Sequence, residues 1–289
     1  MTKKVSTNFV LHAKSDQFYW EGIGQLSIKT FTNGKAYYKT SKGFFAVDES
    51  RYLLLNEGSY TISIDEKKVV ESFCVFFKDG FADEVFNSLK ETNDSLLSDP
   101  YRDKKSIDFF EKTYHTNITL SSQLVTFKQI LYSLEIHSIG YEEIFYKLMQ
   151  SILHEHFNTY KEVESLNAIR NSTREELYRR VNIAHDYIRS YFDKPIKLIE
   201  VAQVACLSPN HLLRTYTQIY GKTPHQHISE FRIQKAKHLL AELDNNMTDI
   251  TFKLGFQNPV SFSKMFKQHV GLSPVEYRKK VISDKKYLI

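Results

Sequence analysis

The sequence predicts an α+β protein of two domains. The first is an N-terminal antiparallel β-barrel or sandwich with helices, and the second is an all-α domain in which a long helix joins two helix-turn-helix units. Three observations predict this arrangement: strand-like runs fill most of residues 26–77, helical periodicity follows over 79–165, and the last third of the chain repeats itself. With 289 residues, the chain is long enough for about two domains.

Short aromatic and β-branched runs, separated by turn signals such as Asn33-Gly34, predict the strands. They lie at 26–31, 35–40, 44–48, 51–56, 60–65 and 72–77. Regularly spaced short strands are typical of an antiparallel barrel or sandwich.

Apolar residues at helical spacing predict three helices after the strands, one from about Asp79 and two stronger ones near 121–137 and 141–165. We expect the stripe on 141–165 to form a dimer seam, with 121–137 packed beside it. The alternative is that both stripes are buried against the sheet. The polar stretch 166–176 is the predicted linker, between an effector and dimerisation domain over 1–165 and a second domain over 177–289.

Composition excludes several classes of protein. With 42% hydrophobic and 25% charged residues, the chain is not a low-complexity or disordered sequence. It has no apolar run long enough for a membrane span, and none follows Met1–Val10 as a signal peptide would require. Two cysteines, Cys74 and Cys206, do not make a disulfide framework, which favours a reduced, cytoplasmic protein.

The net charge of +5 is unevenly distributed. Residues 177–289 hold 18 Lys and Arg against 9 Asp and Glu, a net +9, whereas residues 1–176 hold 21 against 25, a net −4. A basic C-terminal third indicates a module that binds a polyanion, although many basic surfaces bind nothing.

The basic third contains an internal repeat with an offset of 49 to 50 residues. Matched pairs include Leu212 with Phe262, Arg214 with Lys264, Tyr216 with Phe266, and Gly221 with Gly271. Four prolines follow capping residues, at Ser208, Thr223, Asn258 and Ser273, which predicts four helix starts. Each repeat is therefore predicted as a helix, a tight turn, a second helix and a glycine stop, with a long helix from about Pro224 to Leu243 between them. Cys206 falls in the first turn, where we expect a small buried residue.

The second helix of each unit has two faces. Leu212 and Tyr216, like Phe262 and Phe266, are predicted to point inward. The outward faces carry Asn210, Leu213, Arg214 and Thr217 in one unit, and Val260, Ser263, Lys264 and Lys267 in the other. Such helices fit the major groove, where Arg pairs with guanine, Asn with adenine, and an apolar side chain touches a thymine methyl. The alternative is a solvated polar helix face.

The stretch from about Leu177 to Lys280 resembles the DNA-binding domain of AraC/XylS-type transcriptional regulators. The resemblance rests on VAQVACLSPNHLLR (201–214), GKTPHQHISEFRIQKAKHLL (221–240) and ITFKLGFQNPVSFSKMFKQHVGLSPVEYR (250–278). It implies that helices 209–219 and 259–269 read two successive major grooves, with base contacts from Asn210, Leu213, Arg214, Val260, Ser261, Ser263 and Lys264. Thr217 and Lys267 are expected to contact phosphate. Thr251 and His227 depart from the pattern, in which Ala and Tyr are usual.

The N-terminal region looks like the cupin-type domain that often precedes this module, by pattern only. A metal-dependent cupin needs clustered histidines, but none lies between His12 and His115, so we expect no metal and no cofactor. Candidate residues for an effector pocket inside the barrel are Phe31, Tyr37, Phe45 and Tyr60, with core packing as the alternative role.

We therefore predict a cytoplasmic transcription regulator that is not an enzyme. The resemblance implies activation through RNA polymerase, and repression stays open. Expected partners are promoter DNA, a second copy of the chain and a small-molecule effector. The alternative is a small-molecule-binding cupin-like protein or enzyme whose basic tail is incidental.

Overall fold

The fold is that of a computed structural model, which describes residues 7–90, 107–132, 138–166, 170–242 and 245–286. Contacts within the chain divide it into two compact units, Met1–Arg179 and Arg180–Ile289. The first unit contains an antiparallel sheet with helices and the second is entirely helical, so the predicted α+β fold class is confirmed.

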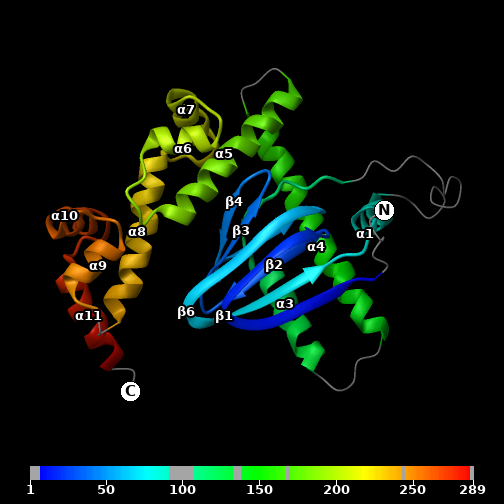
Figure 1. Ribbon diagram of the computed structural model, residues 1–289, viewed down its shortest axis with the longest axis horizontal. Helices are drawn as coiled ribbons and strands as arrows, with labels where there is room; N and C mark the ends of the chain where they lie inside the picture. The colour runs from blue at the N-terminus through cyan, green and yellow to red at the C-terminus, as the bar shows by residue number, and fades with distance from the viewer. Residues whose placement is uncertain (1–6, 91–106, 133–137, 167–169, 243–244, 287–289) are drawn as a thin grey trace, which may run out of the picture. The chain divides into compact units, whose positions relative to one another are not determined.

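Seven antiparallel strands form the barrel-like sheet of the first unit (Figure 1). They are β1 (Phe9–Gly24), β2 (Ser27–Thr32), β3 (Ala36–Thr40), β4 (Phe44–Val47), β5 (Arg51–Leu55), β6 (Gly58–Phe76) and β7 (Lys112–His115). The order along the sheet is β4-β3-β6-β2-β5-β7, and β1 pairs with β6 as well. The long β6 therefore holds three partners, β1, β2 and β3.

Three features of this sheet differ from the prediction. The runs 60–65 and 72–77 are parts of the single strand β6. β1 was not expected, because its sequence does not alternate between apolar and polar residues, and most of its side chains are exposed. It forms by pairing with β6 from Phe9 to Gly24. β7 interrupts the segment 79–165 that was predicted to be helical, because these four residues pair with β5.

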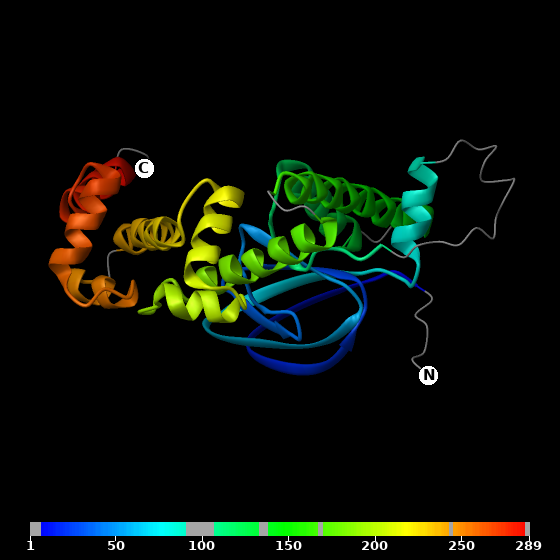
Figure 2. The ribbon, with the colours of Figure 1, turned by 90° about the horizontal axis from the view of Figure 1, so that it is seen from above.

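Helices α1 (Phe81–Lys90), α3 (Ile118–Tyr132) and α4 (Ser138–Glu164) lie on one side of the sheet (Figure 2). The apolar stripe of α4, which includes Phe145, Leu148 and Ile152, is fully buried against sheet residues such as Phe73 and Val75. The predicted dimer seam on 141–165 is therefore wrong, and the alternative of burial against the sheet holds. The hydrophobic effect favours this face because the sheet offers a large apolar surface within the same unit. Residues 133–137 of the predicted helix lie outside the described part.

Alternation along the strands sorts their side chains onto two faces. Ile28, Tyr52 and Leu54 join the core beneath the helices, whereas Phe31, Leu53 and Leu55 belong to a second core inside the curved sheet. By the same alternation, the interior face of β2 also carries Lys29, which sits between Ile28 and Thr30. A strand with a lysine on its buried face departs from the usual pattern of burial.

Helix α5 (Asn171–Tyr191) begins in the first unit and continues into the second. Six helices follow it in the second unit. They are α6 (Leu198–Val204), α7 (Pro209–Tyr220), α8 (Pro224–Ala241), α9 (Met247–Lys253), α10 (Pro259–Val270) and α11 (Pro274–Lys286). Helices α6 and α7 lie at one end of α8, while α9, α10 and α11 lie along the other (Figure 1). Since α5 begins at Asn171, the second half of the predicted linker 166–176 is helical; residues 167–169 lie outside the described part.

All four predicted helix starts are confirmed by capping hydrogen bonds. The Ser208 hydroxyl accepts from the His211 amide and the Asn258 side chain from the Ser261 amide, at 3.3 and 2.8 Å. Thr223 and Ser273 form reciprocal capping boxes with Gln226 and Glu276. These caps satisfy amides that the helices leave without partners, so they set where each helix begins.

Candidate nucleic-acid interface

The outward face of α7 presents the first set of predicted contact residues. Asn210, Leu213, Arg214 and Thr217 are all exposed, while Leu212 and Tyr216 on the same helix are completely buried. The proline at the first position and Gly221 at the end, with φ 66°, limit the helix to three turns. The Thr217 hydroxyl donates to the Leu213 carbonyl at 2.8 Å, so its hydrogen is already used within the helix.

The outward face of α10 presents the second set. Val260, Ser261, Lys264 and Lys267 are exposed and Ser263 is half-buried. Four of them, together with Pro259 and Ser273, line one shallow depression: Val260, Ser263, Lys264 and Lys267. Val260 is 76% exposed, so its apolar side chain is accessible from outside the unit. The structure therefore brings each predicted set together on one exposed helix face.

The inward faces of the two helices hold their units together. Leu212 and Tyr216 pack with Val201 and Ala202 of α6, and Phe262 and Phe266 pack with Ile250 of α9. The two departures from the usual pattern are both accommodated. Completely buried Thr251 donates its hydroxyl to the Met247 carbonyl at 2.8 Å, and Nδ1 of His227 lies 2.7 Å from the Tyr216 hydroxyl oxygen.

The turns of the two units share a left-handed residue. Gly255 has φ 75°, and Cys206 at the matching position has φ 51°. Cys206 was expected to be buried but is exposed, because the left-handed turn directs its side chain away from the helices. Gly255 has no room for a side chain, since a Cβ atom there would lie 2.5 Å from the Asp193 carbonyl oxygen.

A cavity with a volume of about 670 Å³ lies inside the curved sheet of the first unit. Of the four candidate pocket residues, only Tyr60 lines it. Phe31 and Phe45 are buried in the core within the sheet, and Tyr37 stacks on Phe44. The cavity instead lies towards β1, whose position the sequence did not reveal.

Lys29 is the cavity residue that sequence reasoning missed. Its side chain is 1% exposed, and its ammonium group donates to the Tyr60 hydroxyl at 3.1 Å. Burial lowers the pKa of Lys29 to about 8, and it raises the pKa of the neighbouring Cys74 thiol. A signal was available, because Lys29 stands two residues before Phe31 on the same face of the predicted strand 26–31.

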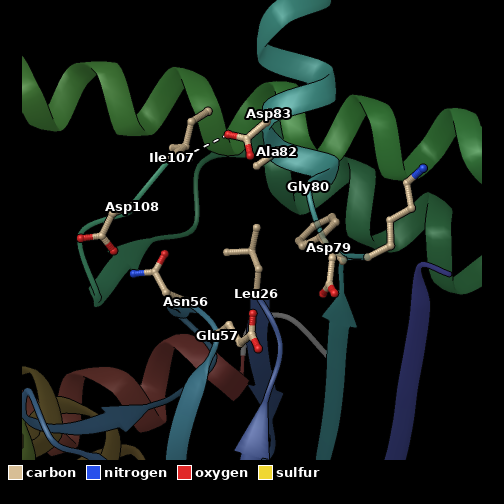
Figure 3. A pocket seen from close by; sticks show the side chains of 11 residues that line it. Leu26, Asn56, Glu57, Asp79, Gly80, Ala82, Asp83, Ile107 and Asp108 are labelled. Atoms are coloured by element: carbon tan, nitrogen blue, oxygen red, sulfur yellow. Dashed lines mark hydrogen bonds between the residues drawn. The ribbon is translucent and has the colours of Figure 1, made fainter. Parts of the chain in front are cut away.

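A smaller pocket of about 230 Å³ lies between the sheet and α1, lined in part by the acidic residues Glu57, Asp79, Asp83 and Asp108 (Figure 3). Two of these carboxylates are already engaged, since the Ile107 amide donates to Asp83 at 3.0 Å (Figure 3) and the Arg179 guanidinium donates to Asp108 at 3.1 Å. Among the described residues, no group of three or more His, Cys, Asp or Glu is arranged to hold a metal ion. In the same part of the chain, no helix is both long and apolar enough to cross a membrane.

Residues 201–280 match the family model described as a helix-turn-helix domain. Together with the duplicated helix pairs and their exposed second helices, this match makes the C-terminal part of the chain a helix-turn-helix domain.

The relatives that share this domain are regulators by name. The chain is 29% identical over 122 residues to the uncharacterized HTH-type transcriptional regulator YobQ of Bacillus subtilis. This match covers 42% of this chain and 51% of that protein. The chain is 33% identical over 99 residues to the HTH-type transcriptional activator RhaS of an Enterobacter species, covering 34% and 36%. The chain thus spans about half or less of the length of the curated relatives it matches.

Two solved structures are also similar. One is the DNA-binding domain of AdpA in complex with a target DNA, at 20% identity and a TM-score of 0.36, covering 37% of this chain and 96% of that one. The other is ToxT from Vibrio cholerae, at 13% identity and a TM-score of 0.35, covering 94% and 98%.

Proposed function

We propose that this protein is a sequence-specific DNA-binding transcription regulator. Helices α7 and α10 would each enter a major groove, in two successive grooves of one duplex. The observation that carries the proposal is the duplication itself: two capped helices in one compact unit each turn an apolar face inward and a polar or basic face outward. The basic excess of the C-terminal third supplies the electrostatic attraction to phosphate.

The exposed side chains suggest a division of roles. Arg214 would pair with guanine O6 and N7, and Asn210 with adenine, while Val260 would contact a thymine methyl. Leu213, Ser261, Ser263 and Lys264 would complete the base contacts. Lys267 would position α10 on phosphate oxygens, and Thr217 would do the same for α7 once its hydroxyl turns away from the Leu213 carbonyl; both add affinity without sequence information.

The test is binding to a site selected from random-sequence DNA, followed by fluorescence anisotropy at physiological salt. Arg214→Ala and Lys264→Ala should each lose roughly 1–3 kcal/mol of specific binding, since each removes one base contact. Lys237→Ala is the matched control, because it removes the same charge from α8 and not from a recognition helix. Absence of sequence-selective binding by the folded protein would refute the proposal.

The remaining partners follow from this role. We infer that the regulator works in the cytoplasm, acts as an activator through RNA polymerase, and responds to a small-molecule effector held in the cavity of the first unit. The cavity volume of about 670 Å³ lies within the range of small-molecule sites. The alternative, an enzyme with an incidental basic tail, has less support because the basic residues Arg214 and Lys264 recur at matched, exposed positions of the repeat.

We also propose that the protein is a homodimer, with a seam on α3 in place of the buried stripe of α4. Ile118, Val125 and Tyr132 follow one another at intervals of seven residues and are 90%, 52% and 68% exposed. A seven-residue apolar repeat suits helix-to-helix pairing. Val125→Glu should shift the protein from dimer to monomer in analytical ultracentrifugation, while Thr126→Glu, on a neighbouring exposed position, should leave the dimer intact.

A further inference from the structure

Lys29 is a buried cation with no anionic partner among the described residues. It lies on β2, faces the interior of the curved sheet, and stands opposite Leu53 on β5 and Cys74 on β6. Its ammonium nitrogen is 3.6 Å from the centre of the Phe76 ring and 5.1 Å from that of Tyr60. No carboxylate in the described part of the chain forms an ion pair with it, and its hydrogen-bond partner is the neutral Tyr60 hydroxyl.

This arrangement costs stability in the unliganded protein. Removing an ammonium ion from water is strongly unfavourable unless an opposite charge compensates it. The ring faces of Phe76 and Tyr60 offset part of that cost through cation–π attraction, and the lowered pKa of Lys29 shows that burial still penalises the charge. With a pKa of about 8, most Lys29 side chains still carry the proton at neutral pH.

The Lys29 ammonium group borders the cavity inside the curved sheet. Lys29, Tyr60 and Cys74 line it, and so do the apolar side chains Trp20, Ile62 and Phe76. The surface that a ligand would meet is thus mainly aromatic and aliphatic, with one cationic point. Polyols such as sugars are poorly suited to such a surface, because each hydroxyl without a partner costs free energy on burial.

We propose that the cavity binds an organic acid with a single carboxylate and an apolar body. The carboxylate pairs with the Lys29 ammonium group and accepts a second hydrogen bond from the Tyr60 hydroxyl, while the body packs on Trp20, Ile62 and Phe76. The ligand carboxylate supplies the negative charge that no described side chain offers to Lys29. The paired carboxylate and ammonium groups are then buried together. This inference gives a chemical class to the effector proposed above, and it rests on that proposal only for the regulatory role of the ligand.

The experiment compares an acid with its uncharged match on the full chain. The probes are 4-phenylbutyrate and 4-phenylbutan-1-ol, titrated by calorimetry in the absence of DNA. Trp20 is the single tryptophan of the chain and lines the cavity, so a change in its emission locates the bound ligand there. We expect the acid to bind at least tenfold more tightly than the alcohol and to perturb the Trp20 emission.

The variant Lys29→Met keeps the length of the side chain and removes its charge. It should weaken binding of the acid at least tenfold and change binding of the alcohol less than twofold. Lys39→Met is the matched control, because Lys39 is an exposed lysine on β3 outside the cavity, and it should bind both probes like the parent. Should Lys29→Met not fold, Tyr60→Phe removes the second donor and should weaken the acid about threefold.

Three results would overturn the inference: no binding of the acid to the parent, equal binding of acid and alcohol, or unchanged binding of the acid by Lys29→Met. Because these titrations contain no DNA, they are independent of the DNA-binding proposal. A protein that binds its selected DNA site but not the acid would refute only the ligand class, and the opposite outcome would refute only the DNA-binding function.

Discussion

The two helix-turn-helix units share one backbone plan but are stabilised differently inside. In the first, the Tyr216 hydroxyl lies between Nδ1 of His185 and Nδ1 of His227, at 2.8 and 2.7 Å. In the second, the rings of Phe256, Phe262 and Phe266 pack with centroids 5.6 and 5.8 Å apart, and their side chains form no hydrogen bonds. Caps and turns are thus what the repeat preserves, while the aromatic cluster of the interior is hydrogen-bonded in one copy and consists of phenyl rings in the other.

The turns of the two units also differ, in the space around the left-handed residue. Cys206 occupies a left-handed position in open surroundings, whereas Gly255 occupies it directly against the Asp193 carbonyl oxygen. The first unit therefore tolerates a side chain at this position, and the second does not. A sequence comparison of the two turns shows the residue change but not this difference in surroundings.

The largest expected effect is that of Gly255→Ala. The new Cβ atom would lie 2.5 Å from a backbone oxygen and the residue would keep φ 75°, so we expect a loss of roughly 2–4 kcal/mol in the free energy of unfolding. Urea denaturation followed by far-UV circular dichroism measures it. Gly221→Ala is the control, because Gly221 has φ 66° with no atom within 4 Å of the added Cβ, and it should cost only about 1 kcal/mol. Equal costs would show that the close approach is unimportant.

Tyr216→Phe is expected to have the next largest effect. It removes the hydroxyl that both histidines share in the first unit, and the loss of buried hydrogen bonds costs about 1–3 kcal/mol. In the second unit, Tyr277→Phe should cost less than about 0.5 kcal/mol, since the Tyr277 ring packs on Phe266 and its hydroxyl forms no hydrogen bond with the described residues. Similar losses in the same denaturation assay would remove the contrast between a polar and an apolar interior.

The outward faces give a third contrast. A guanidinium can bond guanine through two atoms, which an ammonium group cannot match in geometry, so Arg214→Lys should weaken binding to the selected site by roughly 1–2 kcal/mol. Lys264→Arg should change it by less than about 0.5 kcal/mol, because the point charge is retained. Anisotropy with singly substituted sites would show lost discrimination at one base pair for Arg214→Lys. A uniform loss at all positions would assign Arg214 to phosphate.

The smallest effect is expected for Cys206→Gly. Glycine adopts φ 51° without strain, which should stabilise the first unit by up to about 1 kcal/mol. The larger conformational entropy of glycine in the unfolded chain reduces this gain. The midpoint of urea unfolding measures the change. A loss of stability larger than about 1 kcal/mol would mean that the exposed thiol has a packing role that its surroundings do not show.

The helix-turn-helix part of the molecule was predictable because its signals are local. A capping residue, a proline at the first helical position and a glycine at the end act over one helical turn, so Ser208, Thr223, Asn258 and Ser273 marked the helices correctly. The inward and outward faces of α7 and α10 follow from helical periodicity alone, which is why the sequence was sufficient to place Arg214 and Lys264 on exposed faces.

Tertiary structure decided what depends on contacts between distant residues. The 141–165 stripe shows an apolar face but not its partner, and only the fold reveals that the sheet buries it. β1 is held by pairing with β6, from Gly24 opposite Gly58 to Phe9 opposite Phe76, and residues of both strands line the cavity beside it. The sequence by itself determined the duplicated helix pairs and their basic faces, through short-range physics. The surroundings of Lys29, and hence the chemistry of the cavity, arise only where separate strands meet.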